Sequence, residues 1–353
     1  MKRSTRTNLI TYLGVIIAFV ATVILRDSGG LSRSLTGQLV PICCYMSMAV
    51  SLNLTVGILG ELSLGHAGFM SVGAFSGVIA AMSLQSAIPS DALRLAVAMI
   101  VGAAVAAVAG VVIGTPVLRL RGDYLAIVTL AFGEIIKELV NCLLVGWDSR
   151  GLHVALNLTG DKSIADLGLE TEGIAIIKGA QGATSTATIS TFTAGFVLVL
   201  ITLFVVLNLK DSRAGRAIMA LRDNRIAAES VGISVTKYKM IAFVTSAALA
   251  GAAGTLYGCS QTTFVATKFD FNTSILILVF VVLGGLGNMW GSVIAAAALT
   301  ILPEALRQFA DYRMLVYAIV LILVMLATNN PAIWGFFARL RERRAEKKGG
   351  AAK

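Results

Sequence analysis

The chain of 353 residues contains a succession of apolar runs, each close to the length of a membrane-crossing helix. Such a helix needs about 20 predominantly apolar residues to span the hydrocarbon core of a bilayer. The composition agrees, because 57% of the residues are hydrophobic and only 14% are charged. The pattern predicts an all-α polytopic membrane protein with about ten transmembrane helices, and eight spans plus re-entrant halves would also fit. The runs cover residues 9–25, 35–59, 64–84, 93–113, 124–145, 192–209, 240–258, 273–286, 290–306 and 312–328.

The distribution of lysine and arginine predicts how these spans are oriented. The net charge is +10, which in a water-soluble protein would suggest binding to nucleic acid. If both termini are cytoplasmic, nineteen of the 29 cations fall in cytoplasmic segments and nine in external ones. Cytoplasmic loops of membrane proteins carry an excess of positive charge. The charge is therefore interpreted as an orientation signal that places both termini in the cytoplasm, and no nucleic-acid partner is expected.

Two polar segments and a basic tail divide the chain. Residues 147–191, rich in Gly, Ser, Thr and Asp, form an external loop in this topology. Residues 210–239 are strongly basic, have a helical pattern and form a cytoplasmic loop, called the basic loop below. Residues 1–338 are expected to form the transmembrane domain, and residues 339–353 a basic cytoplasmic tail. The tail is expected to fix the topology and to contact anionic lipid.

The sequence lacks the motifs of nucleotide hydrolysis and of metal catalysis. It has no G-x-x-x-x-G-K-[ST] loop to hold phosphates and no G-x-S-x-G turn. The two histidines, His66 and His153, are far from the i, i+4 spacing of a zinc protease helix, and the four cysteines lie in or beside apolar runs. The chain is therefore predicted to have no catalytic residues, no metal and no cofactor of its own. If the chain takes part in transport that costs energy, another subunit or an ion gradient would supply that energy.

The basic loop predicts two short helices. Asp211 or Ser212 can cap the first helix, and Asp223 or Asn224 can cap the second. The second helix has only two turns, and Gly232 would end it in a left-handed conformation. Two turns are marginal in water without a tertiary partner. This stub should therefore pack against the same chain, the lipid surface or a second protein, and an interfacial amphipathic turn is the simplest interpretation of the pattern alone.

Four polar residues form one stripe on a predicted span. Glu134, Lys137, Glu138 and Asn141 lie at positions i, i+3, i+4 and i+7, which share one face of a helix. A lone charge near the middle of a membrane costs about 2.5–3.5 kcal/mol on insertion scales, so the stripe should face protein or a water-filled path. Lys137 can neutralise one glutamate, which favours a self-paired stripe with a structural role. A stripe that lines part of a permeation path is the alternative interpretation.

Several glycines mark breaks and close contacts. His66 and Glu61 lie beside Gly60 and Gly65 at a predicted inner turn, where the histidine is expected to be satisfied by backbone carbonyls, with a gating role as the alternative. The pattern Gly-x-Leu-Gly occurs at similar points in two spans, but it is too short to prove a repeat. Glycines four residues apart predict tight helix contacts. The Gly-x-Leu-Gly pattern occupies residues 57–60 and 284–287. The glycine pairs are Gly73/Gly77, Gly110/Gly114, Gly254/Gly258 and Gly287/Gly291.

Four blocks of sequence together carry a family resemblance. They are Leu62–Phe69, Tyr124–Ile136, Arg222–Ile233 with Tyr238 and the small-residue span Ala242–Gly258, and Gly284–Gly291. These blocks occur in the same order in bacterial ABC importer permeases of the branched-chain amino acid (LivM-type) group. The chain resembles that family over about residues 40–328. Each block alone is a weak signal, and the four in order are specific.

This resemblance implies a multi-pass permease of the bacterial cytoplasmic (inner) membrane that forms half of an alternating-access pathway. Its implied partners are a sister permease subunit in a heterodimer, two cytoplasmic ATPase subunits that bind ATP-Mg, and an extracytoplasmic solute-binding protein. In that family an Ala-Ala-Glu-x-x-Gly helix docks in a groove of the ATPase. The matching ATPase-coupling residues here are Ala227, Ala228, Glu229 and Gly232.

The cargo stays open at the level of sequence. The resemblance implies branched-chain or other hydrophobic amino acids, and the same machinery could carry urea, short amides, aromatic acids or a sugar. A different class of function is a proton- or sodium-coupled secondary transporter that uses Glu134 and Glu138 as proton carriers. Dependence of uptake on ATP or on a protonophore would separate the two classes.

Overall fold

The computed structural model describes residues 3–30, 32–120, 122–148, 150–157, 164–167, 173–184, 186–306 and the three residues 318, 319 and 322. The chain divides into two compact units, Met1–Ala298 and Leu299–Lys353. The elements discussed below lie in the first unit, apart from the last turns of the final helix. Most of the apolar run at 312–328 and all of the basic tail at 339–353 lie outside the described residues.

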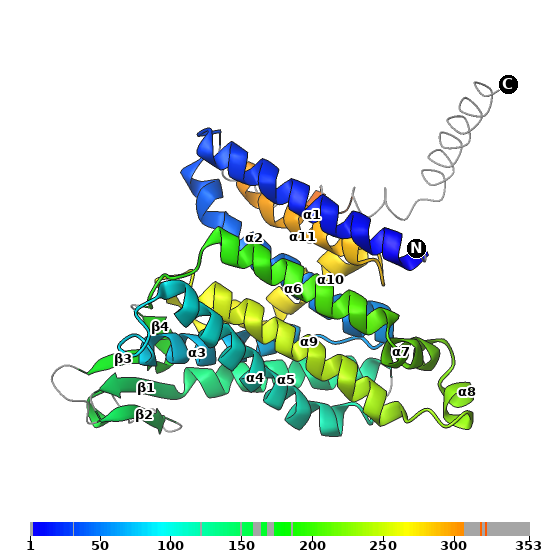
Figure 1. Cartoon of the computed structure of the whole chain (residues 1–353). Helices are drawn as coiled ribbons and strands as arrows, with labels where there is room; N and C mark the ends of the chain where they lie inside the picture. The colour runs from blue at the N-terminus through cyan, green and yellow to red at the C-terminus, as the bar shows by residue number, and fades with distance from the viewer. Residues whose placement is uncertain are drawn as a thin grey trace. The chain divides into compact units, whose positions relative to one another are not determined.

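Most of the described residues are helical, and every predicted apolar run within them contains a helix (Figure 1). The mainly helical architecture is thus confirmed. The helices are α1 Arg3–Asp27, α2 Arg33–Asn53, α3 His66–Ser83, α4 Asp91–Val117, α5 Asp123–Asn141, α6 Phe192–Asp211, α7 Arg213–Asp223, α8 Arg225–Ser230, α9 Val235–Gly258, α10 Phe271–Gly284 and α11 Met289–Ala305.

Five segments of the described chain are helical, long and apolar enough to cross a membrane. Two further apolar helices, α10 and α11, are shorter. The prediction of ten spans therefore stays a prediction. The five segments are Arg33–Leu59, His66–Ser83, Asp91–Val117, Phe192–Asp211 and Val235–Gly258.

Helices α3, α4 and α9 form the most closely packed part of the bundle. A methyl group on Gly73 would overlap the backbone of Gly251, and one on Gly77 or Gly102 would overlap the side chain of Thr255. The Thr255 hydroxyl donates to the carbonyl oxygen of Gly73 at 2.8 Å. Small residues let helix backbones approach closely where lipid supplies no hydrophobic driving force. The tight contact predicted for the Gly73/Gly77 pair is confirmed.

Helix α2 does not end in an ordinary turn. It runs directly into a π-helical turn, Leu54–Leu59, which Gly60 ends with a φ of +80°. The chain then continues without helix to Gly65 and restarts as α3 at His66. π-helical turns leave backbone groups without their usual partners and are frequent at functional sites. The break lies where the sequence predicted a turn beside Gly60 and Gly65.

The prediction of an all-α protein is wrong for the segment that follows α5. A five-stranded antiparallel sheet forms there, in the order β2-β1-β3-β4-β5. Its first strand begins inside the apolar run at 124–145, so that run is not one continuous span. The strands are β1 Leu143–Asp148, β2 Gly151–Leu156, β3 Ile174–Lys178, β4 Ala183–Thr184 and β5 Thr263–Phe264.

Strand propensity and alternation explain this sheet. In β2 the apolar residues Leu152, Val154 and Leu156 alternate with smaller or polar ones, which is the period of a strand. β3 is rich in isoleucine, which favours extended backbone. The segment predicted as an external loop, 147–191, is thus partly a sheet that β5, from beyond α9, completes.

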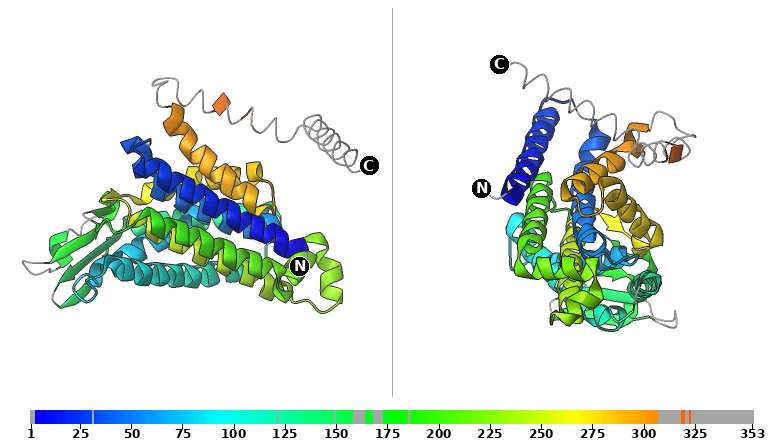
Figure 2. Two further views of the ribbon diagram at one scale, coloured as in Figure 1. Left: turned by 45° about the horizontal axis from the view of Figure 1, so that its top comes forward. Right: turned by 90° about the vertical axis from the view of Figure 1, so that its right-hand side faces the viewer.

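The sheet and the pair α7–α8 lie at opposite ends of the helix bundle (Figures 1 and 2). The basic loop leaves the bundle after α6 as α7, turns through α8 and re-enters it as α9. The π-helical turn that ends α2 contacts both α7 and α9, so it lies at the same end as the basic loop.

Candidate functional site

The basic loop folds into two capped helices, as its sequence predicts. Of the two candidate caps for the first helix, Ser212 is the one used, and its hydroxyl accepts from the backbone N–H of Gly215 at 3.1 Å. For the second helix the cap is Asn224, whose side-chain oxygen accepts from Ala227 N–H at 3.0 Å. Each cap satisfies one N–H that has no partner within its helix. The direction of α7 and α8 is thus set locally.

Helix α8 ends in a Schellman motif. Gly232 has a φ of +84°, as predicted for a left-handed stop. Its N–H donates to the carbonyl of Glu229 at 3.0 Å, and the N–H of Ile233 donates to the carbonyl of Ala228 at 3.0 Å. These two bonds are the defining pair of the motif and satisfy the last carbonyls of the helix. Gly232 therefore turns the chain sharply back toward α9.

The four candidate coupling residues do not share one surface. Ala228 is only 4% exposed and packs with Leu221 and Val235, so it attaches α8 to its own chain. Ala227, Glu229 and Gly232 are exposed. The carboxylate of Glu229 lies 3.1 Å from the guanidinium of Arg225 in the same helix.

The sequence reasoning missed two large apolar side chains, one on α8 and one directly after it. Ile226 is 80% exposed and Val231 is 75% exposed. Exposed apolar residues on a polar segment mark surfaces that contact a partner or lipid. These residues could have been found from the sequence, because they flank the Ala-Ala-Glu block on both sides. A solvated loop would carry polar residues at those positions.

The polar stripe on α5 is paired within itself. Lys137 forms ion pairs with Glu134 and, at 3.7 Å, with Glu138. The amide of Asn141 donates to Glu138 at 3.4 Å. Glu134 also lines a narrow crevice between α3, α5 and α10, together with residues such as Asp270. The single positive charge of Lys137 is shared by the two glutamates, so the stripe keeps one net negative charge.

His66 begins α3 and is buried. Its Nε2 lies 2.8 Å from the hydroxyl of Ser51, so the partner found is a side chain of α2 and not the backbone carbonyls expected from sequence. The same serine presents its carbonyl to the hydroxyl of Ser246 on α9, at 2.6 Å. His66 thus belongs to a hydrogen-bonded contact among α2, α3 and α9.

No group of three or more His, Cys, Asp or Glu that could hold a metal ion occurs in the described part of the chain. The buried cysteines Cys43, Cys44 and Cys259 are free thiols in the helix bundle. The feature of greatest functional interest is therefore the exposed stub α8 with the helices that support it.

The family described as the permease component of branched-chain amino acid transport systems matches residues 34–325. The chain is 35% identical over 292 residues to the high-affinity branched-chain amino acid transport system permease protein LivM of Salmonella typhimurium. It is 34% identical over 292 residues to the protein of that name from Escherichia coli. Each alignment covers 80% of this chain, which spans 66% of the length of these relatives.

A more limited similarity connects the chain to a sugar permease. The ribose import permease protein RbsC of Haemophilus influenzae is 31% identical over 129 residues, which are 34% of this chain and 40% of that protein. No solved structure matches the chain significantly.

The apolar helices and these relatives define a multi-pass membrane protein of the permease class. The chain belongs to the family of permease components of branched-chain amino acid transport systems.

Proposed function

We propose that the chain is the permease subunit of an ATP-binding-cassette importer for branched-chain amino acids. The observation that carries the proposal is the family match over residues 34–325, together with the LivM relatives that align with 80% of the chain. In this proposal the chain forms half of an alternating-access pathway in the bacterial inner membrane, with both termini in the cytoplasm. It is a transporter subunit and not an enzyme.

The other components supply substrate and energy. A sister permease completes the pathway as a heterodimer, and an extracytoplasmic solute-binding protein delivers the amino acid. Two cytoplasmic ATPase subunits bind and hydrolyse ATP-Mg, so this chain needs no cofactor of its own. The basic tail 339–353 then lies on the cytoplasmic side of the transmembrane permease domain 1–338.

Helix α8 is the proposed contact with an ATPase subunit. It lies at the end of the bundle opposite the sheet, and it presents Ile226 and Val231 outward. Ala227 and Glu229 contribute a small and a charged residue to the same exposed stub, and Gly232 shapes its end. The contribution of Ala228 is indirect, because its side chain holds α8 on α7 and α9.

The remaining predicted site residues have a structural role in this proposal. Glu134, Lys137, Glu138 and Asn141 form a self-paired stripe that tolerates the membrane environment. His66 connects α3 to α2 through Ser51.

The test of the proposed function measures uptake of radiolabelled leucine by cells that express the chain with its neighbouring transport subunits. Uptake should stop when ATP is depleted and should be insensitive to a protonophore while ATP is maintained. Collapse with the protonophore alone would contradict ATP-driven import and favour ion-coupled transport. Uptake of ribose without leucine would assign the same machinery to another cargo.

Two variants test the coupling role of α8. Gly232→Pro should reduce leucine uptake about tenfold or more, since proline cannot adopt the positive φ at this position. Glu229→Arg reverses the charge at this position, makes the neutral stub doubly positive and should also uncouple uptake from ATP hydrolysis. Both should leave membrane insertion intact, as measured by membrane fractionation.

Gly29→Pro is the matched control for the glycine variant. Gly29 has a φ of +73° and open space around the position that a Cβ atom would take, and it lies at the end of α1 away from α8. The substitution Gly29→Pro therefore forces the same conflict between proline and a positive φ, at a site outside the proposed contact with the ATPase. Normal uptake by Gly232→Pro and Glu229→Arg would refute the docking assignment.

A further inference from the structure

Two charged side chains, from the helices on either side of α8, reach the same short segment that follows α2. Arg222, in the last turn of α7, donates from Nη1 to the carbonyl oxygen of Gly57 in the π-helical turn. Lys239, near the start of α9, forms an ion pair with Glu61 just beyond that turn. The exposed stub is thus bracketed by two helices that each hold the segment from Gly57 to Glu61.

The backbone of this segment is shaped to receive Arg222. The last carbonyls of a helix lack intrahelical partners, and Arg222 satisfies the one at Gly57. A side chain on Gly60 would lie 2.8 Å from Cγ of Arg222, so glycine lets the arginine lie flat against the turn. A side chain on Gly57 would collide with the side-chain oxygen of Asn53 and the backbone of Gly287. Both glycines of this Gly-x-Leu-Gly pattern are therefore required by a close contact.

The second contact is an enclosed ion pair. The side chain of Lys239 is 5% exposed and that of Glu61 is 17% exposed. By contrast, the pair between Arg225 and Glu229 on α8 is 34% and 47% exposed. Removing one partner of a buried pair leaves an uncompensated charge, which is strongly unfavourable. The Glu61–Lys239 pair therefore resists separation of α9 from the segment that follows the π-helical turn.

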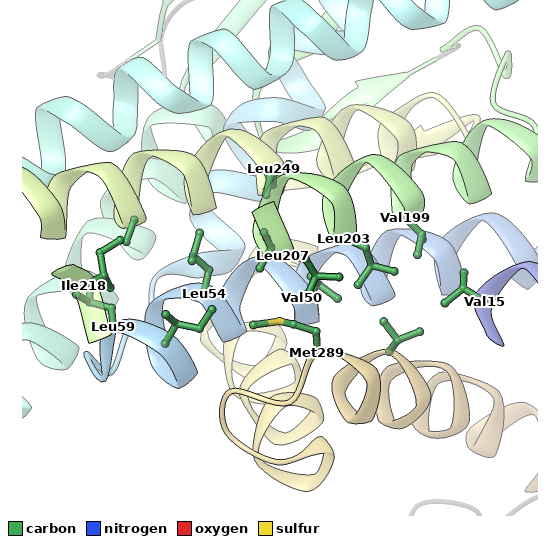
Figure 3. Packing of buried hydrophobic residues seen from close by; sticks show 14 of the residues in the cluster. Val15, Val50, Leu54, Leu59, Val199, Leu203, Leu207, Ile218, Leu249 and Met289 are labelled. Carbon is green, nitrogen blue, oxygen red and sulfur yellow. The ribbon is translucent and has the colours of Figure 1, made fainter. Parts of the chain in front are cut away.

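Apolar contacts complete the link between α8 and the π-helical turn. Ile218 of α7 is fully buried in the same cluster as Leu54 and Leu59 of the turn (Figure 3). Leu221 and Val235, which belong to α7 and α9, pack on Ala228 of α8. Since packed interiors do not deform continuously, a movement of α8 has to move α7 and α9 or break these contacts.

The π-helical turn is also fixed to the connection between α10 and α11. The side chain of Asn53 accepts from Gly287 N–H at 2.8 Å and donates to the hydroxyl of Ser292 at 2.8 Å. Lys210, at the end of α6, donates to the carbonyl of Gly287 at 3.4 Å. The two Gly-x-Leu-Gly patterns, which the sequence left without a role, therefore lie against each other beside Arg222.

We propose that Arg222 and Lys239 form a two-point clamp that transmits movement of α8 to the π-helical turn and to the α10–α11 connection. The proposal rests on the proposed function, in which an ATPase subunit moves α8. The clamp acts on the break between α2 and α3, because residues 60–65 connect the π-helical turn to α3. Arg222 and Lys239 are positioning residues, and neither needs to contact the cargo.

The clamp is tested by hydrogen exchange on the assembled transporter in lipid nanodiscs. The amide exchange of residues 54–65 is compared without nucleotide and after addition of ATP-Mg with vanadate, which traps the ADP-Mg state of the ATPase subunits. This readout requires no cargo. In the wild-type protein the nucleotide should change this exchange. In Arg222→Ala and Lys239→Ala the change should fall about fivefold or more, within the range typical of coupling between sites. Leucine transported per ATP should fall in parallel.

Matched variants separate the clamp from general damage. Arg216→Ala on α7 and Lys237→Ala on α9 remove exposed cations from the same helices and should respond as the wild type does. Because Lys239→Ala leaves Glu61 unpaired, the double exchange Glu61→Lys with Lys239→Glu is the decisive variant. It restores an ion pair and should recover most of the response.

The outcomes distinguish the clamp from the function on which it rests. If the ATPase subunits do not co-purify with the wild-type chain, or if nucleotide has no effect on it, the proposed function and the clamp both fail. If the wild type responds and the Arg222 and Lys239 variants respond equally, the clamp alone is refuted. A reduced response in those variants, with recovery in the double exchange, supports it.

Discussion

Helices α3, α4 and α9 touch through glycine, alanine and a threonine, whereas α7 and α8 are held by the contact of Arg222 with Gly57 and by a few apolar side chains. In the first region the backbones themselves are in contact, so a shift of one helix meets atoms that cannot move aside. In the second region a small number of side-chain contacts carries the connection. The bundle is therefore rigid, and the pair α7–α8, called the lever below, is attached to it by a few defined contacts.

The largest effect should come from adding one methyl group to the rigid region. Gly73→Ala places a Cβ atom against the backbone of Gly251, and we expect it to destabilise the protein by about 3 kcal/mol or more. Thermal unfolding of the purified protein in detergent measures this. Gly37→Ala is the control, since Gly37 also lies in a helix but has open space where a Cβ atom would be added. It should be neutral or stabilising by about 0.5–1 kcal/mol.

An intermediate effect is expected at the junction of the two regions. Asn53→Ala removes the hydrogen bonds to Gly287 and Ser292 and leaves the partly buried N–H of Gly287 without its partner. This should cost about 1–3 kcal/mol of stability in the same unfolding measurement. Asn272→Ala removes an exposed hydrogen bond to Asp270 and should change stability by less than about 0.5 kcal/mol. Equal effects of the two substitutions would show that the junction is not specifically held.

The smallest effect on stability should come from the exposed face of the lever. Ile226→Ser should change the stability of the isolated chain by less than about 0.5 kcal/mol, because Ile226 is 80% exposed. It should nevertheless reduce co-purification of the ATPase subunits, since it removes an apolar contact from the proposed interface. Ser230→Ala, on the same helix, should preserve both properties. Full retention of the ATPase subunits by Ile226→Ser would remove this residue from the interface.

The sequence was informative where the signal is local. Both caps of the basic loop were among the predicted residues, because an N-cap is a contact within four residues. The left-handed stop at Gly232 was predicted for the same reason. The self-pairing of Lys137 with the glutamates of its stripe followed from helical spacing alone.

The errors came from contacts between distant parts of the chain. The sheet was missed because its strands are short and β5 joins them from beyond α9, a pairing that no local pattern reports. The packing of Ala228 on Leu221 and Val235, one of several contacts that the sequence left open for the stub, likewise joins separate helices. The partner of His66 was predicted to be backbone, whereas Ser51, fifteen residues earlier, supplies a hydroxyl.

The sequence by itself determined the membrane-spanning class, the family resemblance and the local shape of the basic loop, because hydrophobic length, ordered motifs and capping depend on neighbouring residues. Only the tertiary structure decided which face of α8 is free and which residues connect it to the bundle. The contacts of Arg222 with Gly57 and of Lys239 with Glu61 join residues 165 and 178 positions apart. Such contacts depend on how whole helices pack, and the identity of two charged residues does not specify that packing.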